Sequence, residues 1–182
     1  MTQPDIQIKE RPNPQKAHRI EMVIENAPGP FAVIEGAANY SVKNHFECGH
    51  IDPVPGIASR ITTHPAIEWK PIGEGRYEAI VYEDLIMDED YYGRGLCRWE
   101  LVSASAMLKA TGAEGETKFL PAISAQRINA SSSLRLNFWA GFYPRAKSDD
   151  YPDYGEEDIS TVSGEQKVEF FAIRMKAEAV SL

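Results

Sequence analysis

Basic residues are under-represented in this chain. It has 19 lysines and arginines against 27 aspartates and glutamates, which gives a net charge of −8 and a pI near 5.1. A protein that binds nucleic acid normally shows a basic stripe or patch, so this balance argues against that class. The acidic excess favours solubility and a partner with a basic surface.

Long apolar runs are missing as well. No run approaches the ~18 apolar residues of a membrane-spanning helix. The leading segment "MTQPDIQIKERPNPQK" is polar and lacks the apolar core of a signal peptide. This leaves open a cytoplasmic protein or an exported one whose signal has been removed. We expect residues 1–16 to be a flexible N-terminal arm and residues 17–182 to form one domain.

Sequence signatures of catalysis are absent too. The chain has no G-x-S-x-G elbow, no P-loop, no dinucleotide fingerprint and no H-E-x-x-H motif. Carboxylates are plentiful, but nothing marks two of them as an acid and base couple. We therefore predict a non-enzymatic protein with no catalytic residue and no cofactor.

Short alternating segments dominate what the chain does contain. Gly- and Pro-rich breaks separate them, as between strands of an all-β domain. Glycines 73 and 75 mark the turn of a hairpin, and Gly36 marks a bulge. We expect an all-β fold, a single immunoglobulin-like β-sandwich of about seven or eight strands with one disulfide. The expected strand regions are 17–25, 31–42, 66–85, 117–124, 132–143 and 166–178, with loops over 43–58 and 145–165.

The segment 96–112 fits two structures. Its residue types tolerate a helix, for which Gly112 would be the C-cap. Alternation favours a strand, with one set of side chains on the same face: Cys97, Trp99, Leu101, Ser103 and Ser105. We favour the strand, and a helix over 99–110 would instead give a mixed α+β fold.

The chain has only two cysteines, Cys48 and Cys97, and the first stands in the stretch "NHFECGH". His45, Cys48 and His50 have the spacing of half a zinc site, but no second cluster completes it. A catalytic thiol would need a paired base, and no family signature surrounds either cysteine. A disulfide between Cys48 and Cys97 is the favoured interpretation, and it would stabilise the fold by about 4 kcal/mol. It would also indicate an oxidising compartment.

Two polar segments combine acids with tyrosines. Tyrosines among acids give adaptable contacts and attract basic surfaces, so these loops are candidates for partner binding, although a merely solvated loop is the competing interpretation. The first segment contributes Asp88, Glu89, Asp90, Tyr91 and Tyr92, and the second contributes Asp149, Asp150, Tyr151, Asp153 and Tyr154. The second does not have the spacing of an EF-hand calcium loop. The three tryptophans, Trp69, Trp99 and Trp139, are expected to pack in the core.

The segment Tyr92-Gly93-Arg94-Gly95-Leu96-Cys97-Arg98-Trp99, with "APGPF..IEG..NY" upstream and Cys48 as an earlier cysteine, resembles a family of bacterial cell-envelope proteins of unassigned activity. The likeness covers roughly residues 17–143. The resemblance implies a small exported protein of the periplasm, often a lipoprotein, with no known catalysis. Some proteins of this kind are immunity partners of secreted antibacterial toxins. The missing export signal departs from the pattern, and removal of the signal and of any lipid anchor would explain it.

The resulting expectation is a periplasmic binding protein, an immunity protein that binds and occludes a secreted effector toxin. Its partner is a protein rather than nucleic acid, and no segment spans the membrane. One alternative is a metal-binding protein or metal-dependent enzyme that uses His45, Cys48 and His50. A second is a structural or carbohydrate-binding envelope module, which would need tryptophans aligned on one exposed face.

Overall fold

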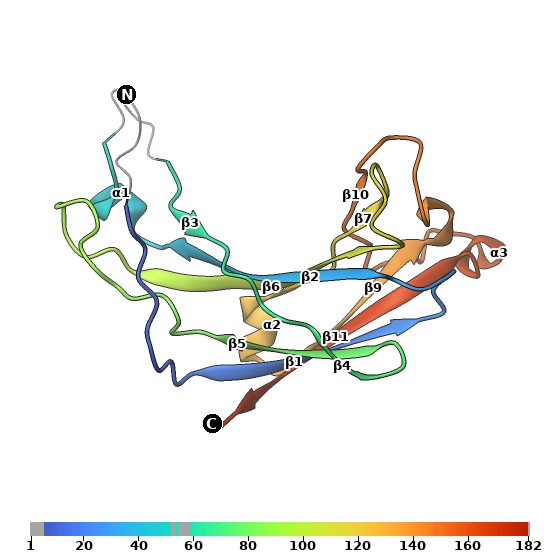
Figure 1. The fold of residues 1–182 in the computed structure, drawn as a ribbon, viewed down its shortest axis with the longest axis horizontal. Helices are drawn as coiled ribbons and strands as arrows, with labels where there is room; N and C mark the ends of the chain where they lie inside the picture. The colour runs from blue at the N-terminus through green and yellow to red at the C-terminus, as the bar shows by residue number, and fades with distance from the viewer. Residues whose placement is uncertain (1–5, 52–53, 55–58, 182) are drawn as a thin grey trace.

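The structure is a computed structural model that describes residues 6–51, 54 and 59–181. Two β-sheets pack face to face, and three short helices lie at their margins (Figure 1). The predicted all-β sandwich with one disulfide is confirmed. The described residues form eleven strands rather than seven or eight, because four of the eleven are only two or three residues long.

One sheet has five strands in the order β4-β5-β1-β11-β9. All its neighbouring strands are antiparallel, and β1 pairs with β11 near the C-terminus along its whole length. The strands are β1 (Ala17–Glu25), β4 (Lys70–Gly73), β5 (Arg76–Tyr82), β9 (Ser133–Trp139) and β11 (Phe170–Val180). Each overlaps an expected strand region, but the last strand begins at Phe170 and not at residue 166 as expected. The β4–β5 hairpin turns at Gly75, whose φ of +66° is a conformation that glycine adopts without strain.

The second sheet follows the order β10-β7-β6-β2-β3, with β8 also paired to β6. Its central strands are β2 (Val33–Val42) and β6 (Trp99–Lys109), so the ambiguous segment is a strand as favoured. The shorter strands are β3 (Thr62–Thr63), β7 (Lys118–Phe119), β8 (Ala122–Ser124) and β10 (Pro152–Asp153).

The core lies between the sheets. Ile20 and Met22 of β1 and Ile173 and Met175 of β11 are fully buried, as the period of two requires. Three phenylalanines, Phe119, Phe138 and Phe171, meet with ring centroids 5.4–5.7 Å apart. Burying a side chain of this size stabilises the fold by roughly 1.5–3 kcal/mol, so this cluster is a main source of stability.

A β-bulge changes which face of β6 is buried. Asn39 pairs with Ser103 but Tyr40 pairs with Leu101, so Val102 is the extra residue. Trp99 and Leu101 point inward as expected, but beyond the bulge Ala104, Ala106 and Leu108 are buried. The expectation that Ser103 and Ser105 share the face of Trp99 is therefore wrong. Both hydroxyls instead accept hydrogen bonds from Asn39 Nδ2, at 2.9 and 3.3 Å.

The bulge was expected at Gly36, and that position is wrong. Gly36 is paired regularly with Ala106. Its lack of a side chain serves packing instead, because a Cβ there would lie 2.5 Å from Nε1 of Trp69. The glycine therefore makes room for the buried indole of Trp69.

The helices are single turns: α1 (His45–Cys48), α2 (Ala125–Asn129) and α3 (Gly164–Lys167), with a 3-10 turn η1 (Ala140–Phe142). Both expected long loops therefore contain short elements, since α1 lies within 43–58, β10 lies within 145–165, and α3 begins there. Ile128 of α2 is fully buried in the core. Within the described residues, no helix is long and apolar enough to cross a membrane.

The expected N-terminal arm lies against the domain from Ile6 onward. Ile6 and Ile8 pack against the core, and Arg11 N donates to Leu85 O at 2.6 Å. The carboxylate of Asp84 accepts the N–H groups of Gln15 and Lys16, each at 2.9 Å. The arm thus packs beside the segment 83–88. Residues 1–5 lie outside the described part of the chain.

Candidate functional site

Cys48 and Cys97 form the predicted disulfide, with an S–S distance of 2.02 Å and both residues buried. It joins α1 to the segment that enters β6. Because both sulfurs are used, Cys48 is neither a zinc ligand nor a nucleophile. The metal site built on His45, Cys48 and His50 is therefore wrong, and no group of three potential metal ligands occurs among the described residues.

Asn44 connects the two segments that the disulfide joins. Its Oδ1 accepts the N–H of Arg98 at 2.8 Å, and its Nδ2 donates to Leu96 O at 2.8 Å. Lys43 N also donates to Arg98 O at 2.8 Å. We call residues 43–51 and 94–98 together the disulfide loops. The cysteine pattern predicted the disulfide between these loops but not the hydrogen bonds that join them.

The neighbouring segment 88–92 was predicted to bind a partner, yet most of its polar groups are engaged within the protein. Asp88 Oδ1 accepts Trp99 N at 2.8 Å, and Glu89 forms an ion pair with Lys9 at 2.9 Å. Asp90 accepts Arg94 N at 3.0 Å. Tyr91 donates to Met87 O at 2.6 Å, and Tyr92 packs against the core. These contacts give the segment a structural role.

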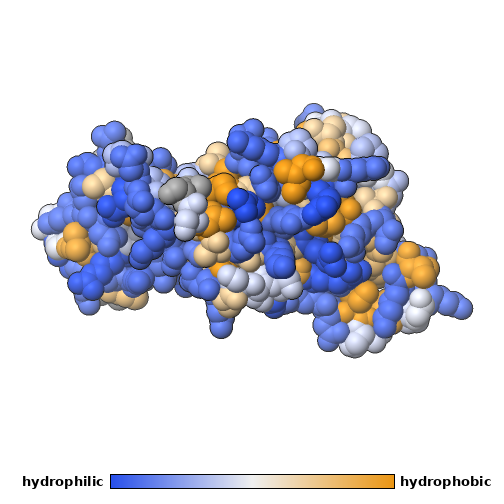
Figure 2. Space-filling model, turned by 90° about the horizontal axis from the view of Figure 1, so that it is seen from below, coloured by the Kyte–Doolittle hydropathy of each residue, from blue (hydrophilic) through white to orange (hydrophobic). Residues whose placement is uncertain are grey.

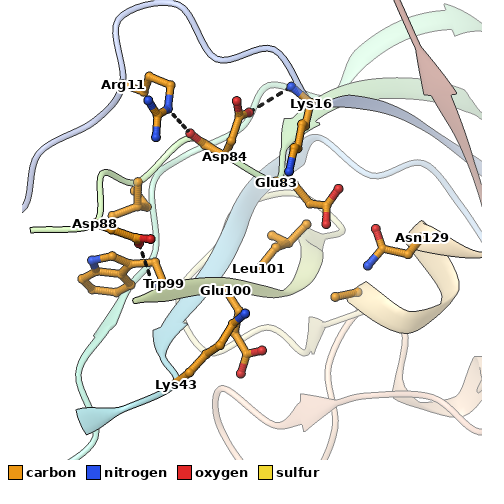
Figure 3. Close-up of a pocket in the computed structure, with 12 residues that line it drawn as sticks. Arg11, Lys16, Lys43, Glu83, Asp84, Asp88, Trp99, Glu100, Leu101 and Asn129 are labelled. Atoms are coloured by element: carbon orange, nitrogen blue, oxygen red, sulfur yellow. Dashed lines mark hydrogen bonds between the residues drawn. The ribbon is translucent and has the colours of Figure 1, made fainter. Parts of the chain in front are cut away.

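A cleft with a volume of about 440 Å³ opens beside this segment (Figure 3). Its walls come from the N-terminal arm, the segment after β5, the start of β6 and α2. Leu101, Ile86 and Ala125 supply its apolar part. The charged and polar lining residues are Arg11, Lys16, Lys43, Glu83, Asp84, Asp88, Glu100 and Asn129.

Hydrogen bonds fix the charge of Asp84 at the edge of the cleft. Burial alone would raise its pKa. The N–H groups of Gln15, Lys16 and Asp84 itself, together with the charge of Arg11, outweigh that effect and hold the pKa below its ordinary value. The carboxylate of Glu83 accepts a hydrogen bond from His18 Nε2 at 3.2 Å. Lys16, Lys43 and Glu100 form no ion pair with another described residue, so they are available to a ligand.

The cleft is lined by both acids and bases. This composition favours a ligand that carries both signs of charge.

The second predicted segment is more exposed. Asp149 forms an ion pair with Arg145, and Asp150 has a positive φ of 55° with its N–H donating to Gly115 O. Tyr154 is exposed, whereas Asp153 is partly buried. Burial raises the pKa of Asp153, and the charge of Glu156 raises it further, although the N–H of Gly155 opposes both.

This segment belongs to a larger acidic region, which we call the acidic segment (residues 145–169). It contains eight carboxylates and only three basic side chains, which accounts for more than half of the net charge of −8. Arg127, outside the segment, pairs with Glu157 at 2.5 Å. The predicted partner-binding segment included Asp149, Asp150 and Asp153 of these acids but did not extend to Glu165 and Glu169.

A row of aromatic side chains lies against the acidic segment. The rings of Trp139 and Phe142 are 4.9 Å apart, and those of Phe142 and Tyr151 are 4.8 Å apart. Trp139 is 40% exposed, and its Nε1 donates to Glu169 Oε2 at 3.2 Å. A Cβ on Gly141 would lie 2.5 Å from the indole, so this glycine lets the ring lie flat against the turn.

The expectation that all three tryptophans are buried is thus wrong for Trp139, whereas Trp69 and Trp99 are buried. Trp139 ends β9, where alternation points its side chain outward, and this signal was present in the sequence. A single exposed tryptophan does not form the aligned platform that the carbohydrate-binding alternative requires.

The two predicted loops do not form one surface. The segment 88–92 lies beside α1 at one end of the long axis, and β10 and α3 of the acidic segment lie at the other (Figure 1). The view from below shows a largely hydrophilic face, with hydrophobic side chains gathered toward the end that carries α3 (Figure 2). The two predicted partner-binding segments therefore lie at opposite ends of the molecule, and the acidic segment is the more exposed of the two.

Comparisons with protein-family models, with curated proteins and with solved structures gave no match to this chain.

Proposed function

We propose that this protein is a non-enzymatic binding protein of the bacterial cell envelope, and specifically an immunity protein that occludes a secreted antibacterial effector. The observation that carries the proposal is the acidic segment, which holds eight carboxylates and lies against the aromatic row of Trp139, Phe142 and Tyr151. A basic protein surface is the partner that complements this charge.

The aromatic row supplies the contact energy that charge alone does not. Trp139 is held by Phe142, by Gly141 and by its bond to Glu169, so it loses little side-chain freedom on binding. Tyr154 and Val168 of the acidic segment are exposed as well. Tryptophan and tyrosine are the residues that most often dominate binding energy at protein interfaces.

Binding here would act by occlusion. Acidic side chains would steer a basic effector toward the acidic segment and speed its association, as long-range charge attraction does. The effector's active-site entrance would then be covered without any covalent step. Effectors that act on anionic polymers carry basic active-site surfaces, which is the complementarity that this mechanism needs.

The periplasm is the compartment that fits the disulfide, because such bonds persist where thiols are oxidised. The resemblance to exported envelope proteins supports the same placement. An export signal or lipid anchor upstream of the mature protein belongs to this proposal.

Charge reversal at the acidic segment tests it. Asp149→Lys with Asp150→Asn should weaken binding to the captured effector by about 10- to 100-fold, since close charge pairs at interfaces contribute roughly 1.5–3 kcal/mol. Bead-bound protein would capture partners from a secreted fraction, and titration calorimetry would measure the affinity of the purified partner. Suppression of its toxicity by equimolar protein would identify it as the effector.

Glu68→Lys with Glu47→Gln is the matched control, because it changes the net charge equally at exposed positions outside the acidic segment. The control should bind as the wild type does. Equal weakening by both variants would show that net charge alone causes the effect. Unchanged binding of the Asp149→Lys, Asp150→Asn variant would overturn the assignment of the acidic segment.

A further inference from the structure

The cleft beside residues 83–88 opens along a gap in the pairing of β6. On the side of β6 away from β2, the chain is paired at Cys97 with Glu89 and again at Ser103–Ser105 with β8. Between these two contacts, no strand of the described residues lies beside β6. Leu101 lies in this gap and is one of the residues that line the cleft. The cleft therefore borders a short open strand edge.

The direction of the hydrogen bonds shows that the backbone of Leu101 faces this gap. Val42 of β2 donates its N–H to Ile61 O at 2.9 Å, so it points away from β6. Residues directly opposite each other in an antiparallel pair exchange both hydrogen bonds or neither, and the two kinds of pair alternate. Trp99 is opposite Val42, so it belongs to a pair without hydrogen bonds. Leu101 follows two residues later opposite Tyr40, so its N–H and C=O also point away from β2.

The neighbouring N–H groups on this edge have partners, whereas the backbone of Leu101 does not. Cys97 N donates to Glu89 O at 2.9 Å, and Trp99 N donates to Oδ1 of Asp88 at 2.8 Å. Within the described part of the chain, no loop backbone group or side chain forms a hydrogen bond with the N–H or C=O of Leu101. The main chain of an extended ligand would supply both bonds, as when a peptide adds a strand to the edge of a sheet.

Charged side chains lie on both sides of this edge. Lys43 and Glu100 are exposed on the outer face of the second sheet, since each is next in the chain to a residue buried in the core. Lys16 precedes β1 and Glu83 follows β5, so both belong to the other sheet. In Figure 3, Leu101 lies between these two pairs. Successive side chains of a peptide along the edge would point to opposite faces, so they would meet one pair and then the other.

The charge balance and the size of the cleft limit the class of ligand. Three bases and four acids line it, which favours neither a purely acidic nor a purely basic ligand. Its volume of about 440 Å³ lies in the range of small-ligand pockets and suits a peptide of a few residues. We propose that the cleft binds a short extended peptide with charges of both signs, whose main chain pairs with Leu101.

Titration of isotope-labelled protein with two tetrapeptides tests the proposal. Lys-Val-Val-Glu and Glu-Val-Val-Lys, both with free termini, present the same charges in the two directions along β6. In amide NMR spectra, at least one of them should shift the signal of Leu101, because its N–H gains a hydrogen bond. Methylation of both valine amide nitrogens should weaken binding by about tenfold or more, since the main-chain donors are lost.

Two variants test the walls of the cleft. Asn129→Trp places a bulky ring among the lining residues and should abolish binding, while Tm stays unchanged because Asn129 is exposed. Lys16→Gln with Lys43→Gln should weaken binding by about 3- to 10-fold, since two exposed charge pairs are lost. Lys70→Gln with Lys176→Gln is the matched control, because it removes the same charge at exposed positions outside the cleft, and it should bind as the wild type does.

Four results would overturn the proposal. The first is that neither tetrapeptide binds the wild type, and the second is that the methylated peptides bind equally well, which would exclude main-chain pairing. The third is equal weakening by both lysine variants, which would assign the effect to net charge. The fourth is undiminished binding by Asn129→Trp, which would place the peptide outside the cleft. None of these results concerns the acidic segment, so they leave the proposed function to its own test.

Discussion

Asp153 combines burial with a carboxylate oxygen, Oδ2, that has no hydrogen-bond partner among the described residues. Its other oxygen accepts the N–H of Gly155 at 3.0 Å. Burial raises the pKa of this acid, and Glu156 raises it further. Asp153 was predicted to contact a partner, but its position in β10 makes it part of the frame that holds Tyr154 at the surface.

Asp153→Asn should stabilise the protein at neutral pH. A raised pKa means that the folded state prefers the protonated acid, so stability falls as the pH rises from the ordinary aspartate pKa to the raised value, and the loss is complete above it. Because the group is partly solvated, screening limits the gain, and we expect a rise in Tm of about 1–2 °C at pH 7. Thermal unfolding of the wild type and the variant measures this difference in Tm, at pH 7 and again at a pH below the ordinary aspartate pKa.

The gain should disappear at the lower pH, where the wild-type acid is protonated in the folded and the unfolded state alike. A lower Tm for the variant at pH 7 would show that the ionised carboxylate is favourably bound, contrary to this account.

The long strands could be predicted because their side chains alternate over seven to eleven residues, as in β1, β6 and β11. Single-turn helices such as α1 give no periodic signal. The bulge at Val102 depends on the register between β2 and β6, which lies in the pairing and not in either strand alone. For the same reason, the sequence did not show that the side chains of Ala104 and Ala106 point into the core.

The disulfide should contribute strongly to the stability of the fold, because it joins α1 to the start of β6. Cys48→Ala with Cys97→Ala opens a loop whose ends are 49 residues apart. The chain-entropy relation predicts a loss of about 4 kcal/mol in the free energy of unfolding. Urea denaturation measures the loss.

Reduced wild-type protein serves as the comparison and should unfold at nearly the same urea concentration as the variant. Equal stability of the oxidised wild type and the variant, or two free thiols in the unreduced denatured protein, would contradict a structural disulfide.

Charge is divided unequally along the molecule. The acidic segment and its aromatic row occupy one end, and the disulfide loops, with the exposed side chains of Phe46, Ile51 and Leu96, occupy the other. The sequence showed both acidic tyrosine segments but not their distance, because the strand order decides which connections share an end of a sandwich. Alternation in β9 indicated the outward direction of Trp139 but not the aromatic row, since Trp139, Phe142 and Tyr151 meet only through the turn η1.

Variants of the disulfide loops should therefore leave effector binding unchanged, because these loops lie at the end of the molecule opposite the acidic segment.

Hydrogen–deuterium exchange of the protein with and without its captured effector tests the central claim most directly. The account predicts slower exchange in residues 145–169 and in η1, because a bound partner would exclude water from the backbone there. Exchange in the disulfide loops should stay the same. Protection confined to residues 43–51 and 94–98, with no change in the acidic segment, would contradict it.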